Sequence, residues 1–78
     1  MYNIVNKNVK KYREIAKISK RRMAELLGME YSQYCKLEAQ GDIKGQLILE
    51  IALYLKIDPK KLMISGMMAE YEEFQSLK

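Results

Sequence analysis

Residues 20–39 read KRRMAELLGMEYSQYCKLEA, and this stretch decides the expected fold. Apolar side chains recur there in steps of three or four residues on both sides of Gly28, which is the spacing of one face of an α-helix. These residues are Met23, Leu27, Tyr34 and Leu37. Gly28 is suited to the left-handed backbone conformation that ends a helix. Small Ala24 lets two helices approach closely, and Met29 adds an apolar side chain to the turn. The pattern is typical of a helix-turn-helix, whose second helix stands out from the domain and fits the DNA major groove.

The rest of the chain also has helical spacing, for example at Val5, Val9, Tyr12 and Ala16. We therefore expect an all-α fold, a compact domain of five short helices with almost no strand. The side chain of Ser19 is expected to cap the second helix. The expected helices are about 6–16, from just after Ser19 to Gly28, about 31–39, about 46–56, and a short helix that starts at Asp58-Pro59.

The same periodicity predicts the residues that form the core. They are Val9, Tyr12, Ile18, Met23, Ala24, Leu27, Met29, Tyr34, Leu37, Ile48, Leu49, Ile51, Ala52, Leu55, Ile57 and Leu62.

Length and composition exclude several classes of protein. The 78 residues suffice for one small domain, and hydrophobic residues at 49% with charged residues at 31% are typical of a globular chain. There is no histidine and only one cysteine, Cys35, so we expect no metal site, no cofactor and no enzymatic activity. No apolar run is long enough to cross a membrane, and no signal peptide is recognisable, so a cytoplasmic, nucleoid-associated location is expected.

The positive charge is concentrated in the first half of the chain. Residues 1–38 hold nine basic and four acidic groups, a net charge of +5, whereas residues 39–78 hold five basic and six acidic groups, a net charge of −1. A basic half on a small domain favours a polyanionic partner such as nucleic acid, although a solvated helix face would have the same charge. Lys20, Arg21 and Arg22 cluster at a helix start, where the helix dipole would add to their attraction for a phosphate.

About three quarters of the chain, from Val5 to Met63, resembles the DNA-binding domain of the phage-repressor-like (Xre/Cro-like) helix-turn-helix family. The ordered set of matching residues carries the resemblance. It comprises Val9, Arg13, Ile18-Ser19, Met23-Ala24-Glu25, Leu27-Gly28-Met29, Leu37-Glu38, Ile51-Ala52, Leu55, Ile57 and Leu62.

The resemblance implies a compact five-helix domain that binds palindromic double-stranded DNA as a homodimer. It also implies roles for particular residues. Base edges would be read by Tyr31, Ser32, Gln33 and Lys36, with Gln33 suited to adenine, Lys36 to guanine, and Tyr31 to a phosphate or a thymine methyl group. Phosphates would be bound by Lys20 and Lys44. Arg21 and Arg22 stand where the family is often acidic or neutral, and we expect them to bind phosphates because of the basic cluster that they form with Lys20. Arg13 and Glu38 would form a structural ion pair.

The chain departs from the family pattern at several positions. Glu30 stands where Ser or Thr usually caps the third helix, and Tyr34 is bulkier than the usual Val or Ile. The loop after the third helix lacks the usual Arg-Gly-Lys and Pro pattern. These departures affect the expected sequence preference and the start of the third helix, not the fold.

We expect residues 1–64 to form the DNA-binding domain and residues 65–78 an amphipathic tail, a candidate for a short sixth helix. The tail carries an apolar stripe, which would dimerise the protein, fold back on its own domain or bind another protein. The stripe is Met67, Met68, Tyr71, Phe74 and Leu77.

The sequence thus predicts a DNA-binding transcriptional regulator, expected to repress, which acts as a homodimer on an inverted-repeat operator with residues 31–39 in the major groove. The alternative is a protein-interaction module of antitoxin or anti-repressor type on the same fold.

Overall fold

The computed structural model describes residues 4–64, and within this range it contains five helices and no strand. The helices are α1 (Ile4–Ile15), α2 (Lys20–Leu27), α3 (Tyr31–Gln40), α4 (Gln46–Leu55) and α5 (Lys60–Met63). The predicted all-α fold is confirmed, and the helix bounds differ from the prediction by one or two residues. The predicted tail and its sixth helix lie outside the described residues.

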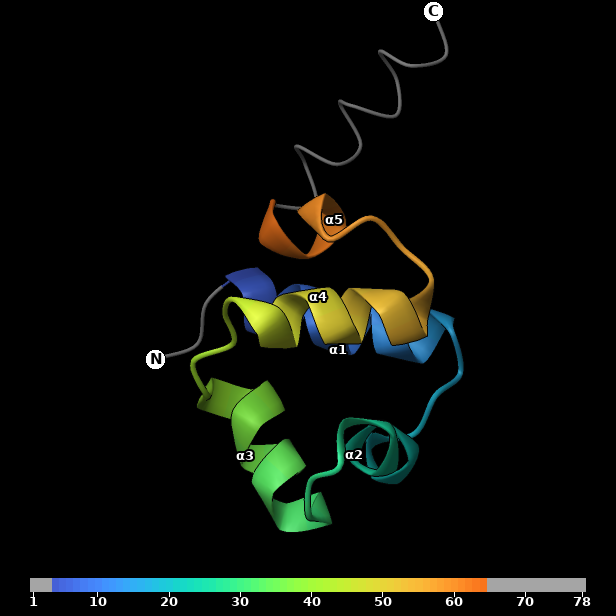
Figure 1. The fold of residues 1–78 in the computed structure, drawn as a ribbon, viewed down its shortest axis with the longest axis vertical. Helices are drawn as coiled ribbons and strands as arrows, with labels where there is room; N and C mark the ends of the chain where they lie inside the picture. The colour runs from blue at the N-terminus through green and yellow to red at the C-terminus, as the bar shows by residue number, and fades with distance from the viewer. Residues whose placement is uncertain (1–3, 65–78) are drawn as a thin grey trace, which may run out of the picture.

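Helix α1 is the centre of the arrangement, since it contacts α3, α4 and α5. Figure 1 shows α1 and α4 across the middle of the domain, with α2 and α3 on one side and α5 on the other. In this view α2 is seen nearly end-on while α3 runs along the plane of the picture, so the two helices cross at a steep angle. Helices α2 and α3 therefore form one end of the molecule.

Local chemistry sets both ends of α2 as the sequence predicts. The Ser19 hydroxyl accepts a hydrogen bond from the backbone N–H of Arg22 at 3.0 Å. At the other end Gly28 has φ 69° and ψ 32°, in the left-handed region, and the N–H of Met29 reaches back to the carbonyl of Ala24 at 2.9 Å. These bonds satisfy backbone groups that the helix itself leaves unpaired, and they fix the turn into α3.

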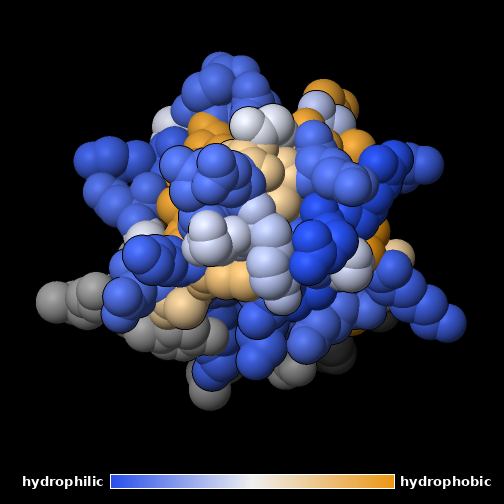
Figure 2. All heavy atoms as spheres, turned by 90° about the horizontal axis from the view of Figure 1, so that it is seen from below, coloured by the Kyte–Doolittle hydropathy of each residue, from blue (hydrophilic) through white to orange (hydrophobic). Residues whose placement is uncertain are grey.

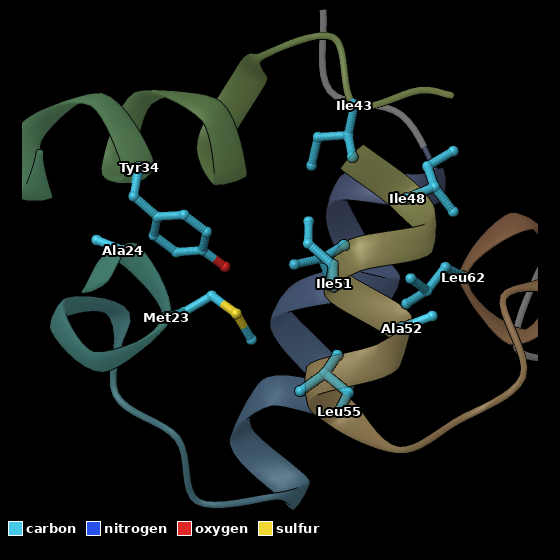
Figure 3. Close-up of a cluster of buried hydrophobic side chains, with 10 residues drawn as sticks. Met23, Ala24, Tyr34, Ile43, Ile48, Ile51, Ala52, Leu55 and Leu62 are labelled. Carbon is cyan, nitrogen blue, oxygen red and sulfur yellow. The ribbon is translucent and has the colours of Figure 1, made fainter. Parts of the chain in front are cut away.

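The core lies between α4 and the α2–α3 pair. Figure 3 shows Met23 of α2 and Tyr34 of α3 extending toward α4, where Ile51 lies. Of the predicted core, nine residues are buried: Val9, Met23, Ala24, Tyr34, Ile48, Ile51, Ala52, Leu55 and Leu62. Six others are partly buried and pack against them: Tyr12, Ile18, Leu27, Met29, Leu37 and Ile57.

Two details of the predicted core are wrong. Leu49 is 53% exposed, because the buried stripe of α4 runs along Ile48, Ile51 and Leu55 and leaves Leu49 on the outer face. Ile43, which the helical pattern omits because it lies in the loop before α4, is only 3% exposed.

Two asparagines of α1 replace part of the apolar stripe that periodicity predicts. The Asn6 amide nitrogen donates to the carbonyls of Leu37 (2.8 Å) and Gly41 (3.0 Å) at the end of α3. The Asn8 amide nitrogen donates to the carbonyls of Leu62 (3.1 Å) and Ile64 (2.6 Å). Both asparagines are buried. Helix α1 thus satisfies carbonyl groups at the ends of α3 and α5, which holds these ends in place.

Gly41 is required by a close approach of the backbone. Its N–H donates to the Leu37 carbonyl at 2.9 Å. A Cβ atom at this position would lie 2.6 Å from the Leu37 Cα atom, too close for any side chain without a shift of the backbone. The glycine therefore sets the end of α3 against which Asn6 binds.

The backbone of Lys56 leads to a first prediction. Lys56 ends α4 with φ 59° and ψ 43°, a conformation in which any side chain costs about 1 kcal/mol relative to glycine. Lys56→Gly should therefore raise the free energy of unfolding by about 1 kcal/mol in urea titration. Lys60→Gly is the matched control, because Lys60 lies in right-handed helix and glycine there should lower stability. A stability loss in Lys56→Gly as large as in the control would contradict the prediction.

Candidate nucleic-acid interface

A buried ion pair fixes α3 to α1. The Arg13 Nε atom lies 2.7 Å from Glu38 Oε1, and Arg13 Nη2 donates to Glu38 Oε2 at 3.3 Å. The two side chains are only 7% and 4% exposed. Arg13 Nη1 also donates to the Ile18 carbonyl at 2.7 Å, so the same guanidinium holds the loop between α1 and α2. Arg13 and Glu38 thus meet as the resemblance implies.

Tyr34 completes this network from α3. Its hydroxyl donates to Glu38 Oε1 at 3.0 Å, four residues along the same helix. Burial raises the pKa of the Tyr34 hydroxyl, and the Glu38 charge and hydrogen bond raise it further. Burial by itself would lower the pKa of Arg13, but the hydrogen bond and charge of Glu38 outweigh it and leave the pKa raised. Tyr34 therefore stays a donor and Arg13 stays charged throughout the neutral range.

The opposite side of α3 is open to solvent. All four residues predicted to read bases, Tyr31, Ser32, Gln33 and Lys36, are exposed. They lie on the outer side of the helix, whereas its buried anchors Tyr34 and Glu38 lie on the inner side. Figure 2 looks at the molecule from the α2–α3 end and shows mostly hydrophilic side chains around a smaller apolar area.

Three of the four predicted phosphate contacts lie on the first turn of α2. Arg21 and Arg22 are exposed there, and Lys20 is half-buried. The guanidinium carbon of Arg21 lies 4.4 Å from the centre of the Tyr31 ring. The fold therefore brings the basic start of α2 next to the start of α3. Lys44, the fourth, lies in the loop after α3 and so beyond the other end of that helix.

Two of these cations have carboxylate partners on the surface. Arg22 Nη1 lies 3.3 Å from Glu25 Oε1, and Lys44 Nζ lies 3.1 Å from Asp42 Oδ2. All four side chains are 60% exposed or more. Exposed ion pairs of this kind are worth about 1 kcal/mol or less, so an incoming phosphate can replace either carboxylate.

Gln33 caps the start of α3, a structural role that was not predicted from the sequence. Its Oε1 atom accepts the backbone N–H of Glu30 at 3.1 Å. This bond caps the start of α3, which begins at Tyr31 with Glu30 at its N-cap. The signal was available, because Gln three residues after the cap is the second half of a capping box. One lone pair of Oε1 is occupied, and the side-chain NH₂ group is left to donate outward.

The remaining sequence predictions concern the C-terminal tail, metal binding and membrane spans. The tail residues Met67, Met68, Tyr71, Phe74 and Leu77 lie outside the described residues. Within residues 4–64, no cluster of three or more Cys, Asp or Glu side chains has the geometry to hold a metal ion. None of the helices described is long and apolar enough to span a membrane.

No protein-family model, curated protein or solved structure matches this chain. A function for this chain is therefore inferred from its own residues and their arrangement.

The ion pair predicts a non-additive effect on stability. Arg13→Met leaves the Glu38 carboxylate buried without its cation, which should cost about 3–5 kcal/mol of unfolding free energy. The double variant Arg13→Met/Glu38→Leu removes both charges and should be more stable than Arg13→Met. Urea unfolding followed by circular dichroism measures both. A double variant less stable than Arg13→Met would contradict a coupled pair.

The raised pKa of Tyr34 predicts a loss of stability at alkaline pH. The folded protein holds the phenol proton more tightly than the unfolded chain, whose tyrosine has the ordinary pKa of 10.0. The resulting stabilisation of the folded protein is fully present below pH 10 and is lost as the pH rises above 10. Unfolding free energy should therefore fall less steeply between pH 10 and 12 in Tyr34→Phe than in the unmodified protein. Tyr54→Phe, at a residue 36% exposed, is the control and should retain the steep fall.

Proposed function

We propose that this domain binds double-stranded DNA sequence-specifically and regulates transcription, with repression as the expected action. The observation that supports this most is the two-sided character of α3. Tyr34 and Glu38 anchor one side in a buried network, and the other side of the helix presents four exposed polar or aromatic side chains, from Tyr31, Ser32, Gln33 and Lys36. A helix of about 10–12 Å diameter matches the major groove, which is about 12 Å wide.

The exposed residues divide into two chemical roles. Lys36 donates to the O6 and N7 atoms of guanine, and the Gln33 NH₂ group donates to N7 of adenine. Lys20, Arg21, Arg22 and Lys44 bind phosphates, which gives affinity without sequence preference. The Arg21–Tyr31 contact supports a single surface for both roles, since it joins a predicted phosphate-binding residue to a predicted base-reading residue.

Phosphate binding by four cations has a measurable consequence. Each protomer releases about four counterions, so the logarithm of the binding constant should fall with the logarithm of salt concentration at a slope of about −3.6 per protomer. Affinity should then drop about 10²-fold per protomer between 50 and 200 mM salt.

We propose that two copies bind one inverted repeat, with half-sites about 34 Å apart, one turn of the DNA helix. The deciding experiment is selection from a random duplex pool at physiological salt, followed by sequencing. An enriched inverted repeat supports the proposed function. Failure to retain any duplex would contradict it.

Variants of the two kinds of residue should separate specificity from affinity. Lys36→Ala removes a base contact and should lower the preference for guanine at one position of each half-site, by about 1–3 kcal/mol. Lys20→Ala removes a phosphate contact, so it should weaken all duplexes alike and reduce the salt slope by about 1 per protomer. Fluorescence anisotropy with the selected duplex and a scrambled duplex measures both effects. Equal losses on both duplexes from Lys36→Ala would exclude its base-reading role.

The outer face of α4 favours a second candidate, a protein-interaction module. Leu49 and Leu53 are 53% and 72% exposed, one helical turn apart. Paired apolar residues on a helix surface are suited to another protein rather than to DNA. Binding to a protein partner that is insensitive to salt, without duplex binding, would favour this candidate.

A further inference from the structure

The contact between Arg21 and Tyr31 is the only cation–π contact between two helices in the part of the chain that the structure describes. The Arg21 guanidinium carbon lies 4.4 Å from the centre of the Tyr31 ring. The two residues belong to the first turn of α2 and the first position of α3, so the contact spans the start of both helices. Tyr31 remains 43% exposed, which leaves part of its ring for an external partner.

Arg21 differs in its surroundings from the neighbouring Arg22. Arg22 pairs with the Glu25 carboxylate, whereas within residues 4–64 Arg21 forms no ion pair. The Tyr31 ring is therefore the contact that orients the Arg21 guanidinium in the described structure. An exposed cation–π contact changes an equilibrium by about two- to fivefold, enough to favour one orientation of the ring.

Stacking does not prevent Arg21 from binding DNA. A guanidinium contacts a ring through its flat face, and its N–H donors point outward in the plane of the group. Arg21 can thus stack on Tyr31 and donate to a phosphate at the same time. The backbone of Tyr31 is also fixed, because the adjacent N-cap of α3 is held by the Gln33 side chain.

The exposed part of the ring selects one kind of base. The thymine 5-methyl group is the one apolar group that base pairs present in the major groove. An aromatic ring whose position is fixed at the start of α3 is complementary to that methyl group.

We propose that Arg21 is a positioning residue for Tyr31, and that the oriented ring contacts a thymine methyl group at one fixed position of each half-site. This inference rests on the proposed DNA-binding function. It assigns Arg21 a part in sequence recognition in addition to its phosphate contact.

The test uses the duplex that the unmodified protein enriches from a random pool. Each thymine in a half-site is replaced in turn by deoxyuridine, which lacks only the methyl group. At one position the replacement should weaken binding of the unmodified protein about two- to fivefold and leave the binding of Tyr31→Ala unchanged. Arg21→Lys, which retains the charge but not the flat group, should show a smaller effect of deoxyuridine at that position. Arg22→Lys is the matched control: it should weaken binding in general and retain the full deoxyuridine effect.

Each outcome bears on a different part of the proposal. If no duplex is retained, the proposed function and this inference both fail. If duplexes are enriched but no thymine methyl couples to Tyr31, DNA binding stands and the thymine contact is excluded. If the methyl effect is equal in Arg21→Lys and the unmodified protein, Arg21 has no positioning role. Nuclear magnetic resonance of the DNA-free protein tests the stack itself, since Tyr31→Leu should shift the side-chain signals of Arg21. Unshifted signals would overturn the inference.

Discussion

The buried pairing of Arg13 with Glu38 is the interaction on which the rest of the structure depends. Two charges this deeply buried are stable only with close geometry and additional hydrogen bonds. Both conditions are met, since Arg13 bonds to both carboxylate oxygens and to the Ile18 carbonyl, while Tyr34 donates to the same carboxylate. The network joins α1, the loop before α2, and α3. It therefore fixes the orientation in which α3 presents its outer face.

The second constraint is the polar inner face of α1. Asn6 and Asn8 are fully or almost fully buried and donate to carbonyls at the ends of α3 and α5. Apolar packing alone would allow these helices to slide along α1, whereas hydrogen bonds to particular carbonyls set their position. Helix α3 is thus held at its C-terminal end by Asn6 and along its inner side by Glu38. Its outer side, with Tyr31, Ser32, Gln33 and Lys36, is left to face solvent, which suits a surface that binds another molecule.

Much of this arrangement could be predicted from the sequence, because local chemistry determines it. Ser19 and Gly28 set the ends of α2, and apolar spacing located most of the core. Spacing failed where burial depends on distant contacts. It placed Leu49 in the core because α4 has apolar residues on both of its faces. It omitted Ile43 because this residue lies in a loop, outside any helical repeat. The burial of Asn6 and Asn8 was not predicted for the same reason, since their carbonyl partners are 31 to 56 residues away in the sequence.

We propose that the fixed α3 and the basic start of α2 form one DNA-binding surface. The most direct test follows the backbone amide signals of the ¹⁵N-labelled protein by nuclear magnetic resonance during titration with duplex DNA at physiological salt. We expect the largest shifts in residues 20–22 and 31–36 and only small shifts on the outer face of α4. Shifts concentrated at Leu49 and Leu53, or no shifts at saturating DNA, would contradict it.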